Sequence, residues 1–153
     1  MKRQGQSIFD SHADIVERAA SWLRGKRYAV VLCEMRNNTL SEVPDVFGVR
    51  ATDGRDTTVI ECKRTRSDFL ADGKKLRTLG VYRWYFACEG IIAPDELPEG
   101  WGLAVVRPLG VRVIRSSDRH QPDRRRELAL LTSAVWQYQH GRGKLIRGEQ
   151  VAT

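Results

Sequence analysis

The sequence predicts an α/β fold in which helices flank a mixed β-sheet. A helix-periodic segment is followed by three strand-like runs, and a second helix-periodic segment precedes further strand-like runs. The turn TDGRD between two of the runs contains an Asp-Gly pair, which is typical of a β-hairpin. With 153 residues, of which 41% are hydrophobic, the chain has the length and apolar content of a single domain over residues 1–153.

The first helix is predicted over residues 11–25, SHADIVERAASWLRG. Ile15, Ala19 and Leu23 recur at helical spacing, and Ser11 is a suitable N-cap. The next three runs, at residues 27–35, 43–50 and 57–64, are rich in β-branched and aromatic residues and are predicted to be strands. The second and third of these strands form the hairpin.

A second helix is predicted over residues 67–80, although Gly73 weakens its middle. A fourth strand follows at 82–89, and two short strands are predicted within 101–116, so the sheet has about six strands. A last helix is predicted over 124–139, followed by a basic tail.

The composition indicates the compartment and the class of partner. No apolar run approaches the roughly 20 residues that span a bilayer, and no apolar segment follows the charged N-terminus, so we expect a cytoplasmic protein with no membrane partner. Cys33, Cys62 and Cys88 have neither disulfide-framework nor zinc-finger spacing and are expected to be reduced. A formal charge of +7 and a pI near 9.7 favour nucleic acid as the partner.

The predicted hairpin gathers three charged side chains. Because side chains alternate across a strand, Glu61 and Lys63 share one face. Asp45 lies on that face beside them only if the numbers of paired residues sum to 106 or 108. Either register centres the hairpin near Asp53 or Gly54, where the Asp-Gly turn lies.

Two carboxylates on one face of a hairpin repel each other unless a cation lies between them. The oxygens of Asp45 and Glu61 suit Mg²⁺ or Mn²⁺, which turns a bound water into an available nucleophile. Lys63 would place an ammonium group at the same spot, and Glu34 at the end of the preceding strand would supply a further carboxylate. The alternative is an exposed hairpin face with ordinary cross-strand ion pairs.

Pro44-Asp45 and Glu61-Cys62-Lys63 resemble the PD-(D/E)XK signature of the restriction-endonuclease-like nuclease superfamily. The segments CEM, PDVFGV, VIECKRTRSDFLADGKK, YRWYFAC and LPEGWGLAVV resemble, in the same order, the MmcB-like family of DNA repair proteins. The resemblance covers roughly residues 28–115. It implies a restriction-endonuclease-like mixed sheet flanked by helices, and a nuclease activity.

The resemblance also implies roles for individual residues. Asp45, Glu61 and the carbonyl of Cys62 would hold the metal, and Lys63 would be the catalytic lysine. Glu34 matches a strand-end glutamate that would join the metal site and the catalytic set, and Glu17 of the first helix is its rival. The helix after the motif would support the site through Asp68, Asp72 and Lys75, and the basic residues expected to bind nucleic acid there are Arg64, Arg66, Lys74 and Lys75.

The expected function is therefore a Mg²⁺- or Mn²⁺-dependent nuclease that hydrolyses DNA phosphodiester bonds by metal-activated water, in DNA repair or phage DNA processing. RNA cleavage would use the same chemistry. A chain with one site needs either a homodimer or two successive nicks to cut both strands. The alternative is a non-catalytic DNA-binding module of a larger repair or phage assembly.

The histidines and tryptophans add no site of their own. His12, His120 and His140 show no metal-ligand spacing and are expected at the surface. All four tryptophans have apolar neighbours and are expected in the core; they are Trp22, Trp84, Trp101 and Trp136. Trp136 has a second reading, because it precedes the basic tail and its ring would stack on an unpaired base there.

Overall fold

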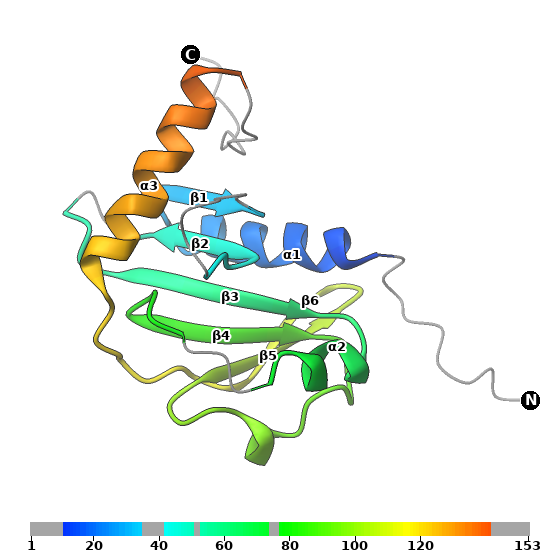
Figure 1. Ribbon diagram of the computed structural model, residues 1–153. Helices are drawn as coiled ribbons and strands as arrows, with labels where there is room; N and C mark the ends of the chain where they lie inside the picture. Colours follow the sequence, from blue (N-terminus) through cyan, green and yellow to red (C-terminus); the bar gives the residue numbers. More distant parts are fainter. Residues whose placement is uncertain (1–10, 35–41, 51–52, 74–76, 142–153) are drawn as a thin grey trace, which may run out of the picture.

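The structure is a computed structural model, and it describes residues 11–34, 42–50, 53–73 and 77–141. Its centre is a six-stranded mixed sheet with the strands in chain order, as Figure 1 shows. The β3 strand pairs with β4 in parallel, β4 pairs with β5 in parallel, and the other neighbours are antiparallel. The strands are β1 (Val30–Cys33), β2 (Val46–Val49), β3 (Thr57–Lys63), β4 (Tyr82–Ala87), β5 (Gly102–Arg107) and β6 (Gly110–Arg115).

Helix α1 (His12–Gly25) covers one face of the sheet. It begins with a capping box, in which Ser11 accepts a hydrogen bond from the backbone of Asp14 and the Asp14 side chain accepts one from the backbone of Ser11. The buried face of α1 packs on apolar side chains of β2, β3 and β4, including Val46, Ile60 and Phe86. This contact forms the larger part of the core.

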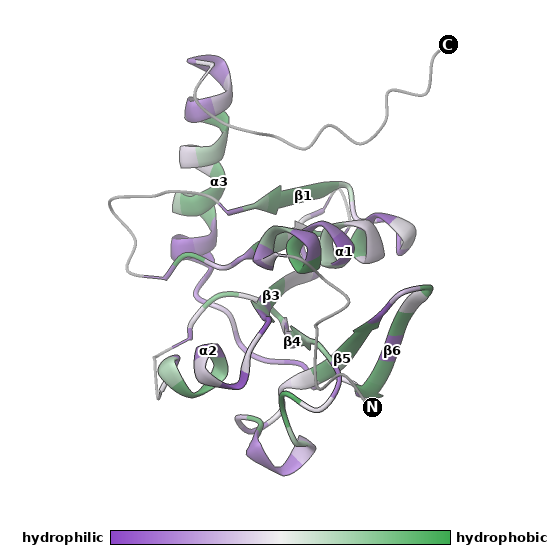
Figure 2. Cartoon of the chain, turned by 90° about the vertical axis from the view of Figure 1, so that its right-hand side faces the viewer, coloured by the Kyte–Doolittle hydropathy of each residue, from purple (hydrophilic) through white to green (hydrophobic). Residues whose placement is uncertain are grey.

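The opposite face carries the other two helices, as Figure 2 shows. Helix α3 (Arg124–Gln139) places Leu130 and Ala134 against side chains of β1, β2 and β3. Helix α2 (Arg66–Ala71) lies at the other end of this face, where Phe69 packs edge-on against Tyr85 at a ring distance of 5.4 Å. The predicted α/β fold, a mixed sheet flanked by helices, is confirmed.

The predicted helix at residues 67–80 is wrong in its second half. Helix α2 ends at Ala71, and Gly73 adopts a φ of +56°, a left-handed conformation that suits glycine and stops a helix. Residues 77–80 are not helical. The carboxylate of Glu42 accepts the backbone N–H groups of Thr78 and Leu79, which a helix would use internally.

The remaining expectations about individual side chains are mostly confirmed. The three cysteines are free thiols, and Trp84 and Trp101 are buried, while Trp22 packs partly buried against the core. Trp136 is not in the core: it is 49% exposed near the C-terminal end of α3, and it stacks on His140. Within the described residues, no helix is long and apolar enough to cross a membrane.

Candidate active site

The β2–β3 hairpin has the register that the charged residues require. Val46 pairs with Ile60 and Val49 with Thr57, so the paired numbers sum to 106. Gly54 lies in the turn with a φ of +69°. One residue beyond the last pair, Asp45 lies opposite Glu61, and both side chains point to the face that α2 and α3 cover. This is the first of the two registers that the sequence allowed.

Proline explains why the ladder ends at this point. In the same register Pro44 lies opposite Cys62, and proline has no N–H to donate to the Cys62 carbonyl. The Cys62 N–H donates instead to Asp45 Oδ2, over 2.7 Å. Because the N–H and C=O of one strand residue point to the same neighbour, the Cys62 carbonyl faces the Asp45 side as well.

Glu61 is a buried carboxylate with little compensation for its charge. Its side chain is 6% exposed, and Oε1 makes no hydrogen bond, although Arg77 Nη1 lies 3.0 Å from it. Burial raises the pKa of Glu61 to about 8, and Asp45 raises this pKa further, against the opposing effects of Arg77 and Lys63. Glu61 therefore needs more positive charge nearby than the two basic side chains provide.

Lys63 and Arg77 share one anionic partner, Asp72, at the C-terminal end of α2. Lys63 Nζ lies 2.8 Å from Asp72 Oδ1, and Arg77 Nη2 lies 3.0 Å from Asp72 Oδ2. The Tyr85 hydroxyl donates to Asp72 Oδ2 over 3.3 Å. Asp72 thus orients the lysine of the motif from the neighbouring element, the supporting position that the resemblance implies for it. Arg77 was not predicted for the site.

His12 also joins the site. It is the first residue of α1, and its Nε2 lies 3.3 Å from Asp45 Oδ1 and 3.7 Å from Glu34 Oε1. The sequence places His12 more than 30 residues from Asp45 and carries no spacing signal for it. Its side chain is half exposed, as expected of a surface histidine, yet the docking of α1 on the sheet brings it to the motif.

The two glutamates that compete for the metal site differ in position. Glu34 follows β1 with a φ of +45°, and its N–H donates to the carbonyl of Asp45 over 2.9 Å. Its exposed carboxylate reaches His12 at the rim of the site. Neither glutamate lines the pocket itself, and Glu17 is exposed on α1 without a contact to a described residue of the site. Glu34 is therefore the nearer of the two.

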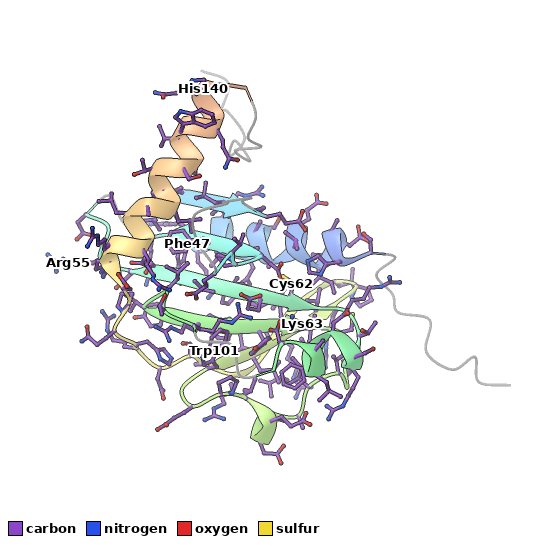
Figure 3. The ribbon with its side chains drawn as sticks, in the orientation of Figure 1. Phe47, Arg55, Cys62, Lys63, Trp101 and His140 are labelled. Carbon is purple, nitrogen blue, oxygen red and sulfur yellow. The ribbon has the colours of Figure 1, made fainter. Side chains whose placement is uncertain are left out.

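These side chains surround one open pocket of about 460 Å³ at the end of β3 beside α2, where Figure 3 labels Cys62 and Lys63. Its described lining has four acidic side chains and two basic ones, Lys63 and Arg77, so acidic groups outnumber basic groups there. The lining residues are His12, Val43, Asp45, Glu61, Cys62, Lys63, Asp68, Ala71, Asp72 and Arg77.

The side chains suit a hard divalent cation that keeps several waters. Within the described ranges, no group of three or more His, Cys, Asp or Glu side chains is placed to hold a metal ion. Mg²⁺ does not require such a group, because one or two carboxylates plus water are its usual ligands. Asp45, the orphaned Oε1 of Glu61 and the excess of acidic groups in the pocket meet that requirement.

The basic residues predicted to bind nucleic acid differ in burial and in their ion-pair partners. Arg64 is partly buried directly after Lys63. Arg66 forms a two-pronged ion pair with Glu96 and donates to the carbonyl of Ile91, so a phosphate would have to displace Glu96. Lys74 and Lys75 lie outside the described residues.

No protein-family model matches the chain, and no curated protein matches it significantly. A solved structure, described as SPO1766 protein of unknown function from Silicibacter pomeroyi, superposes on it with a TM-score of 0.65. The two chains are 22% identical, and the match covers 83% of this chain and 85% of the other. At this identity the likeness shows a shared fold and assigns no activity.

Proposed function

We propose that the chain is a Mg²⁺- or Mn²⁺-dependent nuclease of the PD-(D/E)XK, restriction-endonuclease-like superfamily that hydrolyses DNA phosphodiester bonds. The observation that carries the proposal is the pairing register, which sets Asp45 opposite Glu61 with Lys63 on the same face, all lining one pocket. The mixed six-stranded sheet with helices on both faces is consistent with that superfamily. The MmcB-like segments favour a role in DNA repair, with phage DNA processing as the second setting.

Asp45, Glu61 and the carbonyl of Cys62 would hold the cation, and His12 and Glu34 stand at the rim beside Asp45. A divalent cation bound there would make a water acidic enough to act as a nucleophile and would neutralise charge on the reacting phosphate. Asp45 is itself held by the Cys62 N–H, which fixes the direction of its second oxygen.

Lys63 would act on the reacting atoms. Its side chain is 11% exposed, and its ammonium group is oriented by Asp72 inside the pocket. In that position it can hydrogen-bond the attacking water or stabilise charge that develops on the phosphate oxygens. The formal charge of +7 supports a nucleic acid as the substrate.

The test is cleavage of supercoiled and linear DNA with Mg²⁺ or Mn²⁺ by wild type, Asp45→Asn and Asp53→Asn. Asp45→Asn should lose at least about a hundredfold in rate, because a ligand oxygen and its charge are removed together. Asp53 lies in the turn of the same hairpin and pairs with Arg55, so Asp53→Asn should cleave like wild type. Equal rates for all three proteins, or none from any of them, would refute the proposed activity.

The second candidate is a non-catalytic DNA-binding module. The contacts of Arg77 with Glu61 and Asp72 favour it, because they partly compensate the pocket without any metal. Such a module would bind DNA with the same affinity in EDTA as in Mn²⁺. Calorimetry with Mn²⁺ separates the two functions, since only a metal site would show binding that Asp45→Asn abolishes.

A further inference from the structure

Arg77 occupies the oxygen of Glu61 that a metal would use. Its guanidinium bridges two buried carboxylates, with Nη1 3.0 Å from Glu61 Oε1 and Nη2 3.0 Å from Asp72 Oδ2. The side chain is 13% exposed and lines the pocket, although its residue belongs to no helix or strand. Arg77 is thus a positive charge inside the candidate metal site.

The backbone under Arg77 is held from two sides. Arg83 Nη1 donates to the Arg77 carbonyl over 3.0 Å. The buried carboxylate of Glu42 accepts from the N–H groups of the two residues that follow, Thr78 and Leu79. The backbone at Arg77 is therefore held in place, and a change of partner would require only that the Arg77 side chain move.

The two basic side chains of the pocket differ in how they are held. Lys63 contacts the carboxylate of Asp72. Arg77 holds Asp72 with one edge of its guanidinium and Glu61 with the other. A planar guanidinium has separate donors on its two edges, so it can release one anion and keep the other. A divalent cation beside Glu61 would repel the edge that faces Glu61.

We propose that Arg77 is an internal counter-ion that gives up Glu61 when a divalent cation binds, keeps Asp72, and turns the freed edge to a non-bridging oxygen of the substrate phosphodiester. This inference rests on the proposed metal site. It makes Arg77 a phosphate ligand in the loaded site and a competitor of the metal in the empty one. Retention of Asp72 keeps the guanidinium within the pocket throughout.

Mn²⁺ binding to wild type, Arg77→Gln and Arg66→Gln tests the exchange, with free Mn²⁺ read from its EPR signal under argon at alkaline pH, where protons compete least for Glu61. Arg77→Gln should bind Mn²⁺ at least about tenfold more tightly, because the positive charge that pairs with Glu61 Oε1 and repels the cation is removed. Arg66→Gln removes the same charge from the exposed pair with Glu96, and its affinity should stay within about twofold of wild type.

The outcomes separate the two proposals. Equal or weaker Mn²⁺ binding by Arg77→Gln would overturn the counter-ion inference and leave the metal site standing, provided that Asp45→Asn abolishes binding. No Mn²⁺ binding by either wild type or Arg77→Gln would overturn both. Tighter binding by Arg77→Gln and Arg66→Gln alike would also overturn the inference, since it would reflect overall charge.

A measurement on wild type does not depend on the folding of a variant. The ¹⁵N resonance of Arg77 Nε, assigned with Arg77→Lys, should shift when Mg²⁺ is added, while that of Arg66 should not. Inorganic phosphate added afterwards should shift the Arg77 resonance again. An Arg77 resonance unmoved by Mg²⁺ overturns the inference, and one that moves with Mg²⁺ but not with phosphate removes the role in substrate binding.

Discussion

Glu61 combines deep burial with close charged neighbours of both signs. Arg77 contacts Glu61, and Lys63 contacts the nearby Asp72. Burial and the charge of Asp45 nevertheless raise the pKa of Glu61 to about 8. A carboxylate in this state favours a proton or a further cation. The charge of Glu61 therefore affects both the stability of the protein without metal and the affinity of the proposed site for a metal.

This pKa predicts how stability depends on pH. Between the ordinary value of 4.5 and about 8, the folded protein retains a proton on Glu61 that the unfolded chain has released. Stability of the metal-free protein should therefore fall as the pH rises through this window. Urea denaturation in EDTA should show that Glu61→Gln removes this part of the decline. A variant whose pH profile parallels that of wild type would contradict the assignment.

His12 illustrates a side chain whose contribution depends on its neighbours. Its Nε2 lies 3.3 Å from Asp45 Oδ1, so His12 would stand beside any cation that Asp45 held. An imidazole beside a carboxylate favours Mn²⁺ over Mg²⁺, since nitrogen ligands suit transition metals better than magnesium. The position of His12 thus bears on which of the two expected metals the site prefers.

At the scale of elements, the segment between α2 and β4 determines where Arg77 lies. The spacing of Phe69, Leu70 and Leu76 indicated a longer helix, but Leu70 is 60% exposed and contributes nothing to a buried stripe. The left-handed Gly73 ends the helix, and Glu42 then holds the chain in a non-helical path. If α2 continued to residue 80, Arg77 would lie on the helix, and its position would be set by the helical turn instead of by the path that brings it to Glu61.

The Glu42 anchor should be worth a measurable part of the stability. Its buried carboxylate accepts from Thr78 N, Thr78 Oγ1 and Leu79 N. Glu42→Gln replaces an acceptor oxygen with an amide donor, and the free energy of unfolding should fall by about 2 kcal/mol. Glu89→Gln is the matched control, because Glu89 is exposed and its pair with Arg107 is 3.6 Å long, and it should change stability by less than about 0.5 kcal/mol. Equal effects in urea denaturation would refute the anchor.

At the scale of the whole molecule, the sheet brings distant segments to one edge of the pocket. The hairpin supplies Asp45, Glu61 and Lys63, and the parallel β3–β4 pairing lets the intervening segment return with Asp72 and Arg77 over the same face. Helix α1 approaches from the opposite layer and presents His12 at the end of β2. The pocket is thus a product of the topology.

The positive charge of the molecule predicts how it binds DNA. If Lys and Arg side chains neutralise even three phosphates, affinity should fall at least about tenfold between roughly 50 and 200 mM salt. Fluorescence anisotropy with a labelled duplex in EDTA measures this term apart from cleavage. Asp45→Asn should show the same salt dependence as wild type, because it alters the pocket and leaves the basic residues unchanged. Affinity that is independent of salt would exclude the charge as the source of binding.

Local patterns were sufficient for much of this protein. The helices at 12–25 and 124–139 follow from apolar spacing and caps, which depend on neighbours within a few residues. The Asp-Gly turn and the alternation of side chains limit the hairpin to two registers, and both place Asp45, Glu61 and Lys63 on one face, so their convergence was predictable.

His12, Asp72 and Arg77 became neighbours of those residues through packing. Asp72 was expected to support the site, but its contacts with Lys63 and Arg77, the contact of His12 with Asp45 and the exposure of Trp136 have no periodic signature. These features arise where a helix packs on the sheet, or where a buried carboxylate such as Glu42 accepts hydrogen bonds from the backbone of a distant segment. Such contacts join residues far apart in the chain, and the burial of apolar surface and the pairing of buried charges select them together.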